Sequence, residues 1–296
     1  MEINKVIICG LGALGLTYAN KLKNLCDLKI LANHERVEKY KKKIPNLNGE
    51  NIELDYITPS QRFDADLIII STKSLGLDSA IEYIKNFVTE KTIIISLING
   101  ISSEENIKKT YPEAKVLRSY FIGHSAIGVN ENGEKKYFQD GVGKIVFESD
   151  LELEAFFKKN NIDYEIANDI IFSQWIKLGV NIILNEPSAI YKCSVGDLRR
   201  RKDYLALAKN LIGEVKQVAG ACGIKKLGDY EKIVLESAEL IADDGKTSMY
   251  QDVVAKRKTE VDIFSGEIIR LGCKYGIKTP YNEEIYSKIK LLEKEF

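Results

Sequence analysis

Near its start the chain reads Lys5-Val-Ile-Ile-Cys-Gly-Leu-Gly-Ala-Leu-Gly15, a short apolar run followed by a glycine-rich turn. Residues 16–25 then show a helical pattern, so the order is strand, G-x-G-x-x-G, helix. Gly10 permits a tight turn, Gly12 lets a pyrophosphate approach the backbone, and Gly15 allows close packing of helix on strand. Free N–H groups at the helix N-terminus suit anionic oxygens. We therefore predict a dinucleotide-binding loop made of Gly10, Leu11, Gly12, Ala13, Leu14 and Gly15; the alternative is a turn whose glycines serve packing only.

The end of the second predicted strand, residues 28–32, is where such a domain distinguishes NAD from NADP. An acidic residue there binds the 2′-hydroxyl of NAD, whereas neutral or basic residues admit the 2′-phosphate of NADP. The residue in this chain is Asn33, and Arg36 follows it. Both side chains can donate to a phosphate, so the sequence favours NADP(H). Glu35 argues against this preference, and the alternative for Arg36 is a solvated charge at a helix start.

Apolar runs rich in β-branched residues continue through the first half of the chain. They cover residues 66–71, 92–98, 115–121 and 144–147, and helical patterns at residues 77–88 and 104–110 lie between the early ones. Apolar strands that alternate with helices predict an α/β Rossmann-type domain with a mostly parallel sheet covered on both faces. Asn132-Gly133 is a turn signal, so we expect a hairpin near the end of the sheet.

Two loops are expected beyond the carboxyl ends of the strands, where such sheets bind ligands. Lys73, in Thr72-Lys73, can face a cofactor phosphate or a substrate carboxylate. Asn99, in Asn99-Gly100, can bridge cofactor and substrate. The competing interpretations are a surface lysine and an ordinary turn. Ser102 and Glu105 have the spacing of a capping box, so we interpret both as structural.

The composition changes from strand patterns to helical patterns near residue 165. Helical patterns cover residues 169–185, 205–222, 230–243, 248–275 and 282–294. We therefore predict two domains: residues 1–165 as an NAD(P)-binding Rossmann-like domain and residues 166–296 as an all-helical substrate and catalytic domain.

Residues 175–185 combine a nearly apolar helix with a stripe of three polar residues. Lys177, Asn181 and Asn185 are spaced four apart, which places them on one face of a helix. An ammonium group and two carboxamides inside a core are costly unless a polar group meets them. Either another protein segment or a polar ligand must therefore meet the stripe.

Ser248 and Glu260 lie in the fourth predicted helix. Ser248 precedes Met-Tyr-Gln251 at a capping-box spacing, so its default role is an N-cap. Glu260 is twelve residues later, about 18 Å away along one straight helix. On such a helix the two cannot both touch a small substrate, so one would serve the substrate and the other the cofactor or Lys177. The alternative for Glu260 is a surface ion pair.

The composition argues against several classes of protein. The 43 basic and 43 acidic residues balance, so we expect neither a nucleic-acid nor a membrane partner. Five scattered cysteines fit a reducing cytoplasm rather than a disulfide framework or a zinc site. Two histidines cannot make a multi-histidine metal site, so no metal is expected. Neither a leader peptide nor an apolar run of about 18 residues is present, so we expect no export and no membrane span.

Taken together, these motifs resemble the ketopantoate 2-reductase family, NADPH-dependent enzymes that make pantoate for pantothenate synthesis. The resemblance covers essentially the whole chain: residues 10–15 resemble the cofactor loop, residues 175–185 the catalytic helix, and residues 247–252 and 259–262 two C-terminal signatures. It implies that Lys177 is the general acid. It implies substrate contacts at Asn99, Asn181, Asn185 and Ser248. It also implies cofactor contacts at Lys73, Asn99, Glu260 and the backbone of Ala126, with Glu260 also orienting Lys177.

Three residues depart from the family pattern. Asn33 stands where the family has a basic reader of the 2′-phosphate, Val195 where some members have a substrate-contacting Asn, and Glu186 interrupts the usual Asn-Pro after the catalytic helix. These departures leave open which 2-keto acid is reduced and whether NADPH or NADH is preferred.

The resemblance implies hydride transfer from nicotinamide C4 to a 2-keto acid, with a proton from Lys177 to the carbonyl oxygen. The site is expected in an interdomain cleft that closes on the substrate. The alternatives are a related reductase with a different 2-keto acid, and a dinucleotide-binding sensor without catalysis. The apolar C-terminal helices can cover one another or a second subunit, so a homodimer stays open.

Overall fold

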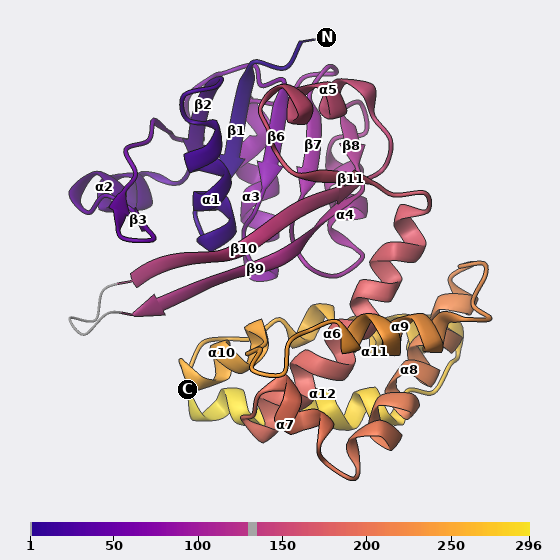
Figure 1. Ribbon diagram of the computed structural model, residues 1–296. Coiled ribbons are helices and arrows are strands. Elements are labelled where there is room, and N and C mark those ends of the chain that lie inside the picture. The colour runs from indigo at the N-terminus through magenta and orange to yellow at the C-terminus, as the bar shows by residue number, and fades with distance from the viewer. Residues whose placement is uncertain (1, 130–134) are drawn as a thin grey trace. The chain divides into compact units, whose positions relative to one another are not determined.

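The computed structural model describes residues 2–129 and 135–296, and for residues 124–129 and 135–142 it describes the backbone alone. The chain forms two compact units, Met1–Ile170 and Ile171–Phe296 (Figure 1). The first unit contains strands and helices, and every regular element of residues 171–296 is helical. The predicted α/β domain followed by an all-helical domain is therefore confirmed as the fold class.

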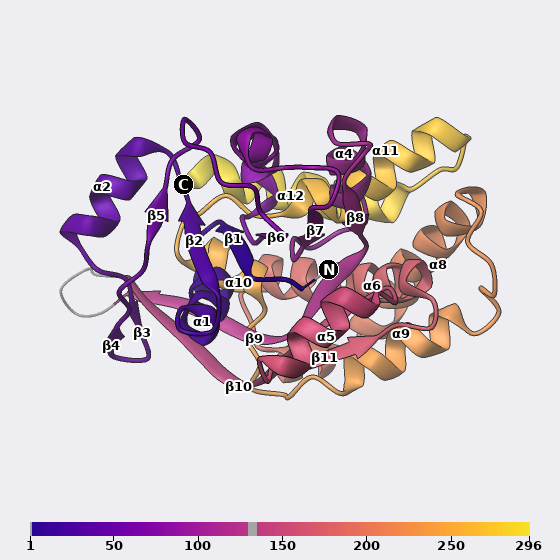
Figure 2. The ribbon, with the colours of Figure 1, turned by 90° about the horizontal axis from the view of Figure 1, so that it is seen from above.

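The first unit is built on a six-stranded sheet. Its strands are β1 (Lys5–Cys9), β2 (Asp27–Leu31), β5 (Tyr56–Ile57), β6 (Leu67–Ile70), β7 (Ile93–Ser96) and β8 (Lys115–Leu117). Their order is β5-β2-β1-β6-β7-β8, visible from left to right in Figure 2, and all neighbours are parallel. β6 and β7 are buried at every residue, which explains why their sequences read as continuous apolar runs rather than alternating ones.

Helices cover both faces of this sheet. The helical elements of the unit are α1 (Ala13–Leu22), α2 (His34–Lys42), η1 (Ser74–Gly76), α3 (Leu77–Tyr83), η2 (Ile84–Asn86), α4 (Ser103–Thr110) and α5 (Leu151–Lys159). In Figure 2, α3 and α4 lie on one face, and α1 lies on the other. One core cluster joins the sheet to α1 and α5. This core holds the glycine-rich turn between β1 and α1 in place.

A second sheet lies beyond α1 and shares its core. It contains β9 (Ser119–Val129), β10 (Lys135–Phe147), β11 (Tyr164–Ile166), β3 (Asn46–Leu47) and β4 (Glu50–Asn51). β9 and β10 pair antiparallel, as expected of a hairpin, and the Asn132-Gly133 turn lies outside the described residues. Tyr18 of α1 meets Phe121 of β9 edge to face, with ring centroids 6.2 Å apart. The α1 helix is therefore packed between the two sheets.

Two local predictions for the first unit are wrong. Residues 115–121 form parts of two strands in different sheets, because the N–H of Arg118 leaves the ladder and donates to Glu148 Oε1 at 2.7 Å. Ser102 occupies the N-cap of α4 but its side chain makes no capping hydrogen bond. Glu105 instead accepts from Arg118 Nη2 at 3.0 Å. Capping-box spacing alone therefore did not predict these contacts.

The second unit contains only helical elements. They are α6 (Ile170–Tyr191), α7 (Val195–Arg199), α8 (Tyr204–Ala221), α9 (Tyr230–Glu239), α10 (Ser248–Val254), η3 (Val261–Ile263), α11 (Ser265–Tyr275), α12 (Pro280–Leu292) and η4 (Glu293–Glu295). The first of these is longer than predicted and continues through Pro187. Complete burial of Ile183, Glu186 and Ala189 holds that last part in the core despite the missing proline N–H.

The single helix predicted at residues 248–275 is wrong. The chain leaves α10 after Val254, passes Lys256 at φ 51°, and resumes as α11 at Ser265. The break is stabilised by a local turn, in which Arg257 N donates to Asp252 O at 2.8 Å, and by a tertiary contact, in which Thr259 N donates to Glu293 Oε1 at 2.7 Å. The 18 Å separation calculated for one straight helix therefore does not apply to Ser248 and Glu260.

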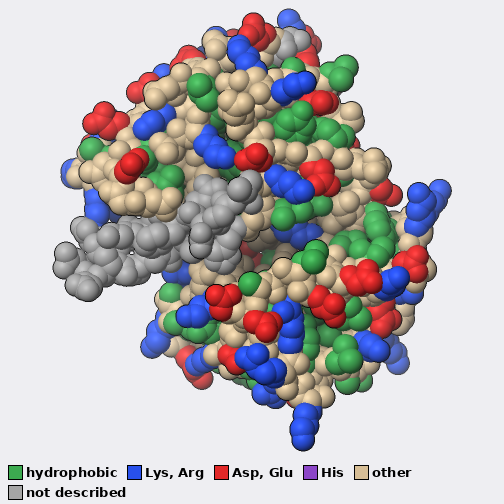
Figure 3. Space-filling view, in the orientation of Figure 1, with side chains coloured by type: hydrophobic (Ala, Val, Ile, Leu, Met, Phe, Trp, Pro, Cys, Tyr) green, Lys and Arg blue, Asp and Glu red, His purple; other side chains and the backbone are tan. Residues whose placement is uncertain are grey.

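None of the helices in the described part of the chain has the length and apolar character needed to cross a membrane. Over the face shown in Figure 3, Lys and Arg side chains are interspersed with Asp and Glu side chains. Within the same described residues, no group of three or more His, Cys, Asp or Glu is arranged to hold a metal ion.

Candidate active site

The three glycines of the N-terminal loop differ in the space that is available for a side chain. Gly10 has φ 106°, and a Cβ there would lie 2.6 Å from Thr72 N. A Cβ on Gly15 would lie 2.0 Å from Gly10 O, so close packing of α1 on the loop requires glycine. By contrast, within the described part of the chain no atom beyond the two adjoining residues lies within 4 Å of a Cβ built on Gly12. The space at Gly12 is thus open on the protein side, which is what a ligand approaching the backbone needs.

The N-terminus of α1 is suited to an anion. Its N-cap, Gly12, has no side chain to accept from the first N–H groups, and the first turn contains no acidic residue. The helix dipole and the N–H groups are therefore not neutralised by side chains there. Leu11 and Ala13 are buried and Leu14 packs against the core, so the loop offers its backbone rather than its side chains. These residues fit the pyrophosphate of a dinucleotide.

Asn33 and Arg36 lie just beyond β2. Asn33 is the N-cap of α2, and its Oδ1 accepts from Arg36 N at 2.9 Å. Burial raises the pKa of the Tyr40 hydroxyl, and a hydrogen bond from the Arg36 side chain partly offsets this. The Arg36 charge also acts on Cys9, whose burial raises its pKa to about 12. The guanidinium thus lies beside Tyr40, and the capping contact of Asn33 uses its Oδ1 rather than its amide N–H groups.

Three loops meet at one edge of the six-stranded sheet. β1, β6 and β7 are parallel neighbours, so the residues that follow them lie along the same edge. Gly10 follows β1, Thr72 and Lys73 follow β6, and Asn99 follows β7. Lys73 is exposed and Asn99 is half-buried. Ala126 lies in β9, where its backbone pairs with Phe138, and its side chain is not described.

The polar stripe lies on α6 as its spacing predicts. Lys177, Asn181 and Asn185 are half-buried, whereas Leu178 and Ile182 between them are at most 1% exposed. Asn181 Nδ2 is buried and has no hydrogen-bond partner among the residues that the structure describes. This donor has been removed from water without receiving an acceptor, an arrangement that costs about 1–3 kcal/mol. A ligand oxygen would satisfy it.

Ser248 lies against the end of the stripe. Asn185 Nδ2 donates to Ser248 Oγ at 3.4 Å, and the neighbouring hydroxyls of Ser188 and Thr247 are 2.8 Å apart. The predicted N-cap role of Ser248 is wrong, because Thr247 occupies the N-cap and accepts from Tyr250 N at 3.2 Å. Since Ser248 does not cap the helix, its hydroxyl proton can be donated to a ligand.

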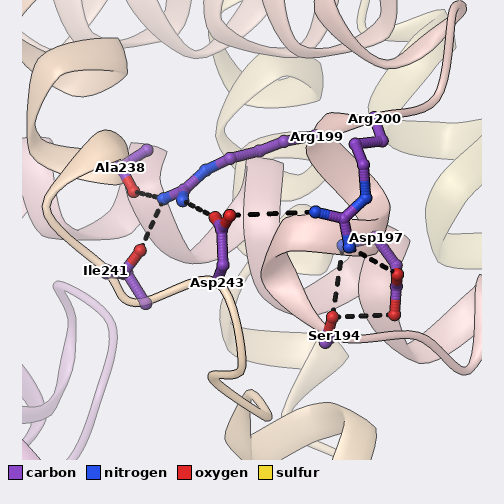
Figure 4. A network of polar contacts seen from close by, with 7 residues as sticks. All are labelled: Ser194, Asp197, Arg199, Arg200, Ala238, Ile241 and Asp243. Carbon is purple, nitrogen blue, oxygen red and sulfur yellow. Dashed lines mark hydrogen bonds and ion pairs between the residues drawn. The ribbon is translucent and has the colours of Figure 1, made fainter.

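The segment that leads to Ser248 is tied to α7 by Arg199 (Figure 4). Arg199 Nη1 donates to Asp243 Oδ1 at 2.7 Å, and Nη2 donates to the carbonyl oxygens of Ala238 and Ile241. The Ala238 carbonyl lies at the end of α9, where it also accepts from Ile241 N at 3.3 Å, and the Ile241 carbonyl belongs to the loop after it. Gly196 N also donates to Asp243 O at 2.8 Å. The guanidinium therefore fixes the course of the chain from α9 toward α10.

Glu260 is not part of α10 or α11. It is the half-buried N-cap of η3, and the preceding residue, Thr259, donates from its N–H and its hydroxyl to Glu293 Oε1, both at 2.7 Å. The position of Glu260 is therefore set by the short segment between the two helices.

Two family models match the chain. The model of ketopantoate reductase PanE/ApbA covers residues 6–150, and the model of the PanE/ApbA C-terminal region covers residues 169–293. The chain belongs to the ketopantoate reductase family. The resemblance seen in the glycine loop, the α6 stripe and the two C-terminal signatures is thus confirmed.

Similar proteins extend over the full length of the chain. The 2-dehydropantoate 2-reductase of Aquifex aeolicus is 28% identical, with 98% of this chain and 97% of that protein covered. A ternary structure of D-mandelate dehydrogenase with NADH and anilino(oxo)acetate is similar with a TM-score of 0.85 and 23% identity, covering 98% of this chain and 99% of that one. A dimeric ketopantoate reductase from Staphylococcus aureus is similar with a TM-score of 0.78 and 22% identity, covering 98% and 99%. These structural similarities support the fold of an oxidoreductase family, not a particular substrate.

Val195 and Glu186, two departures from the family pattern, are core residues here. Val195 is completely buried, and its N–H donates to Gly245 O at 3.0 Å. Glu186 is also completely buried, and Ser265 N donates to its Oε1 at 3.0 Å. Both side chains therefore serve the packing of the helical unit.

The hydrogen bonds around Glu186 indicate that it carries a proton. Ser265 Oγ is 2.5 Å from Glu186 Oε2 and 3.1 Å from Asn282 Oδ1, and its one hydrogen cannot serve both. The amide of Asn282 is oriented by Glu214, to which its Nδ2 donates at 2.7 Å. If Glu186 is protonated, its O–H donates to Ser265 and Ser265 donates to Asn282, which satisfies every group. Burial raises the pKa of Glu186 to about 8, in agreement with this assignment.

Proposed function

We propose that the protein is an NADPH-dependent ketopantoate reductase, which reduces 2-dehydropantoate to pantoate in the cytoplasm as a step of pantothenate biosynthesis. The observation that carries the proposal is the buried, unpartnered Nδ2 of Asn181 in the middle of the Lys177 stripe. A 2-keto acid has the carboxylate and carbonyl oxygens that such a donor lacks. Family membership supports the class of reaction.

The cofactor would be held mainly by the first unit. Residues 10–15 and the N-terminus of α1 fit its pyrophosphate, and Asn33 and Arg36 can donate to a 2′-phosphate. Lys73, Asn99, Glu260 and the backbone of Ala126 are the further proposed contacts. The bound nicotinamide supplies the hydride that the keto carbon accepts. Because Asn33 carries no charge, it can also accommodate a free 2′-hydroxyl, so the preference for NADPH rests on Arg36.

Lys177 would donate the proton that the carbonyl oxygen needs as it becomes an alkoxide. Asn181, Asn185 and Ser248 would hold the substrate oxygens without adding a second positive charge. Ser248 Oγ accepts a hydrogen bond from Asn185 Nδ2, which leaves its hydroxyl hydrogen for a substrate oxygen. Glu260 would orient Lys177 or contact the cofactor. The residues proposed for the reaction thus come from both units.

The other proposed properties follow from composition and comparison. The partner is a small 2-keto acid rather than nucleic acid or membrane, because the charges balance. A homodimer is proposed because a ketopantoate reductase similar to this chain is described as dimeric.

A related reductase with a different 2-keto acid and NADH is the second candidate. Some members of the family have a substrate-contacting Asn where this chain has Val195. Val195 is completely buried and offers no such polar contact, which favours a different substrate. D-mandelate dehydrogenase, a structure similar to this chain, is bound to NADH. A dinucleotide sensor without a keto-acid substrate would provide no acceptor for the buried Nδ2 of Asn181.

The test is oxidation of NADPH and NADH with a panel of 2-keto acids that includes ketopantoate and phenylglyoxylate. We expect kcat/KM to be highest for ketopantoate with NADPH, by about 10-fold or more over other pairs. A higher value for another keto acid would support the second candidate. No oxidation with any pair would support the sensor.

A further inference from the structure

One buried hydroxyl group beside the glycine loop has no hydrogen-bond partner. Oγ1 of Thr72, the second residue after β6, is out of contact with solvent and makes no hydrogen bond. In the described part of the chain, the one other buried side-chain polar atom in this state is Nδ2 of Asn181. An unsatisfied hydroxyl is destabilising, and a valine of the same shape would avoid that penalty. Such a group calls for a ligand or bound solvent as its partner.

Thr72 is placed between two glycines. A Cβ on Gly10 would lie 2.8 Å from Thr72 Cγ2, and a Cβ on Gly76 would lie 3.4 Å from Thr72 Oγ1. The methyl group therefore faces the first glycine of the loop, and the Thr72 side chain as a whole packs against Gly76, the residue that ends η1. Since β6 pairs with β1, this hydroxyl lies at the same sheet edge as the open space beside Gly12.

The neighbouring residue, Ser71, shows what a structural hydroxyl looks like at this edge. Its Oγ donates to Gly10 O at 2.7 Å and so braces the loop from within the protein. Thr72 Oγ1 makes no equivalent bond. The loop is therefore held by Ser71, and the Thr72 hydroxyl remains for another partner.

We propose that Thr72 is a further binding residue for the dinucleotide, and that its hydroxyl donates a hydrogen bond to a phosphate or ribose oxygen. This inference rests on the proposed dinucleotide-binding function. The uncapped N-terminus of α1 and the room beside Gly12 bring an oxygen-rich ligand to the same edge. One bound ligand would thus satisfy the helix N–H groups and the Thr72 hydroxyl together.

The test compares Thr72→Val, Thr72→Ser and Ser71→Ala in the full-length chain. Two quantities are measured: the thermal midpoint of the unliganded protein, and the Kd for NADPH and NADH from nicotinamide fluorescence. We expect Thr72→Val to keep or raise the midpoint and to raise the Kd about 10-fold. Thr72→Ser keeps the hydroxyl and should bind like the wild type. Ser71→Ala should lower the midpoint, because it removes a buried bond that the fold uses.

A lower midpoint for Thr72→Val with an unchanged Kd would mean that the hydroxyl serves the fold through bound solvent, and would overturn the inference. Weaker binding that comes with a midpoint loss matching that of Ser71→Ala would overturn it too. Both results require that the wild type binds a dinucleotide. If the wild type binds neither NADPH nor NADH, the proposed function fails and this inference fails with it.

Discussion

The protonation state of Glu186 is set by neighbours on three other helices. Ser265 of α11 and Asn282 of α12 offer the carboxyl group one hydroxyl hydrogen between them, and Glu214 of α8 fixes the orientation of the amide. A neutral acid satisfies this arrangement, whereas a carboxylate leaves Asn282 Oδ1 without a donor. A residue that interrupts the family pattern in the sequence is thus a hydrogen-bond donor within the core.

This assignment predicts a pH dependence of stability. The pKa of Glu186 is raised from 4.5 to about 8, so between these values the folded chain holds a proton that the unfolded chain has lost. The free energy of unfolding must fall as pH rises through this window, by up to about 1.4 kcal/mol per pH unit from this group, and level off above it. Glu186→Gln cannot lose a proton. Its stability relative to wild type should therefore rise by about 2 kcal/mol between pH 5.5 and 7.5 in urea unfolding.

Parallel stability curves for wild type and Glu186→Gln over that range would contradict the neutral assignment. Other titrating groups affect both proteins equally, so the difference between them isolates residue 186.

Substitutions at Gly12 and Gly15 distinguish a role in ligand binding from a role in stabilising the fold. Gly12 has φ −84°, which alanine adopts readily, and among the described residues its Cβ would meet no atom beyond the two adjoining residues. We expect Gly12→Ala to keep its thermal midpoint but to lose at least about 10-fold in dinucleotide affinity, because the methyl group fills ligand space. Gly15→Ala is the matched control and should lower the midpoint, since its Cβ would lie 2.0 Å from Gly10 O. Wild-type affinity of Gly12→Ala for the dinucleotide would contradict binding at this loop.

At the scale of elements, the Arg199 contacts link α7 and α9 to the segment that carries Ser248. Arg199→Lys keeps the charge but cannot donate to Asp243, Ala238 O and Ile241 O together. We expect the KM for the keto acid to rise about 10-fold, with kcat changed less and the Kd for NADPH unchanged. Arg200→Lys is the control, because the Arg200 side chain is 65% exposed, pairs with Asp197 at 2.7 Å and approaches Asp243 only to 3.8 Å.

If Arg199→Lys lowers stability and impairs KM, kcat and the NADPH Kd alike, the guanidinium serves only to stabilise the fold. The kinetic constants and the NADPH titration, measured on both variants, decide between these roles.

Elements with strong periodic patterns could be predicted from the sequence, and those that depend on tertiary contacts could not. β6, β7 and α6 were predicted because their burial leaves continuous apolar runs or a stripe. The break after α10 was missed because it contains neither Gly nor Pro, and Lys256 has a positive φ there. It is stabilised by a local bond from Arg257 to Asp252 and by Glu293, 34 residues from Thr259, which accepts from Thr259 N.

The candidate site was predictable to a similar extent. The glycine loop and the Lys177 stripe have recognisable spacing. The unpartnered hydroxyl of Thr72 and the contacts of Arg199 have no recognisable spacing in the sequence. Whether a polar atom finds a hydrogen-bond partner depends on the tertiary structure.

At the scale of the whole molecule, the proposed cofactor contacts lie mainly in the first unit, and the proposed proton donor, Lys177, lies in the second. The two units have separate internal packing, with α6 in the second. Removal of the proton donor should therefore leave dinucleotide binding intact, which separates catalysis from cofactor affinity.

The most direct test is the turnover of Lys177→Ala with NADPH and ketopantoate, together with its Kd for NADPH. Lys209→Ala, an exposed lysine of α8, is the control. We predict a decrease in kcat of about 10²- to 10⁴-fold for Lys177→Ala with an NADPH Kd close to wild type, and no change for the control. Turnover of Lys177→Ala near the wild-type value would contradict the account.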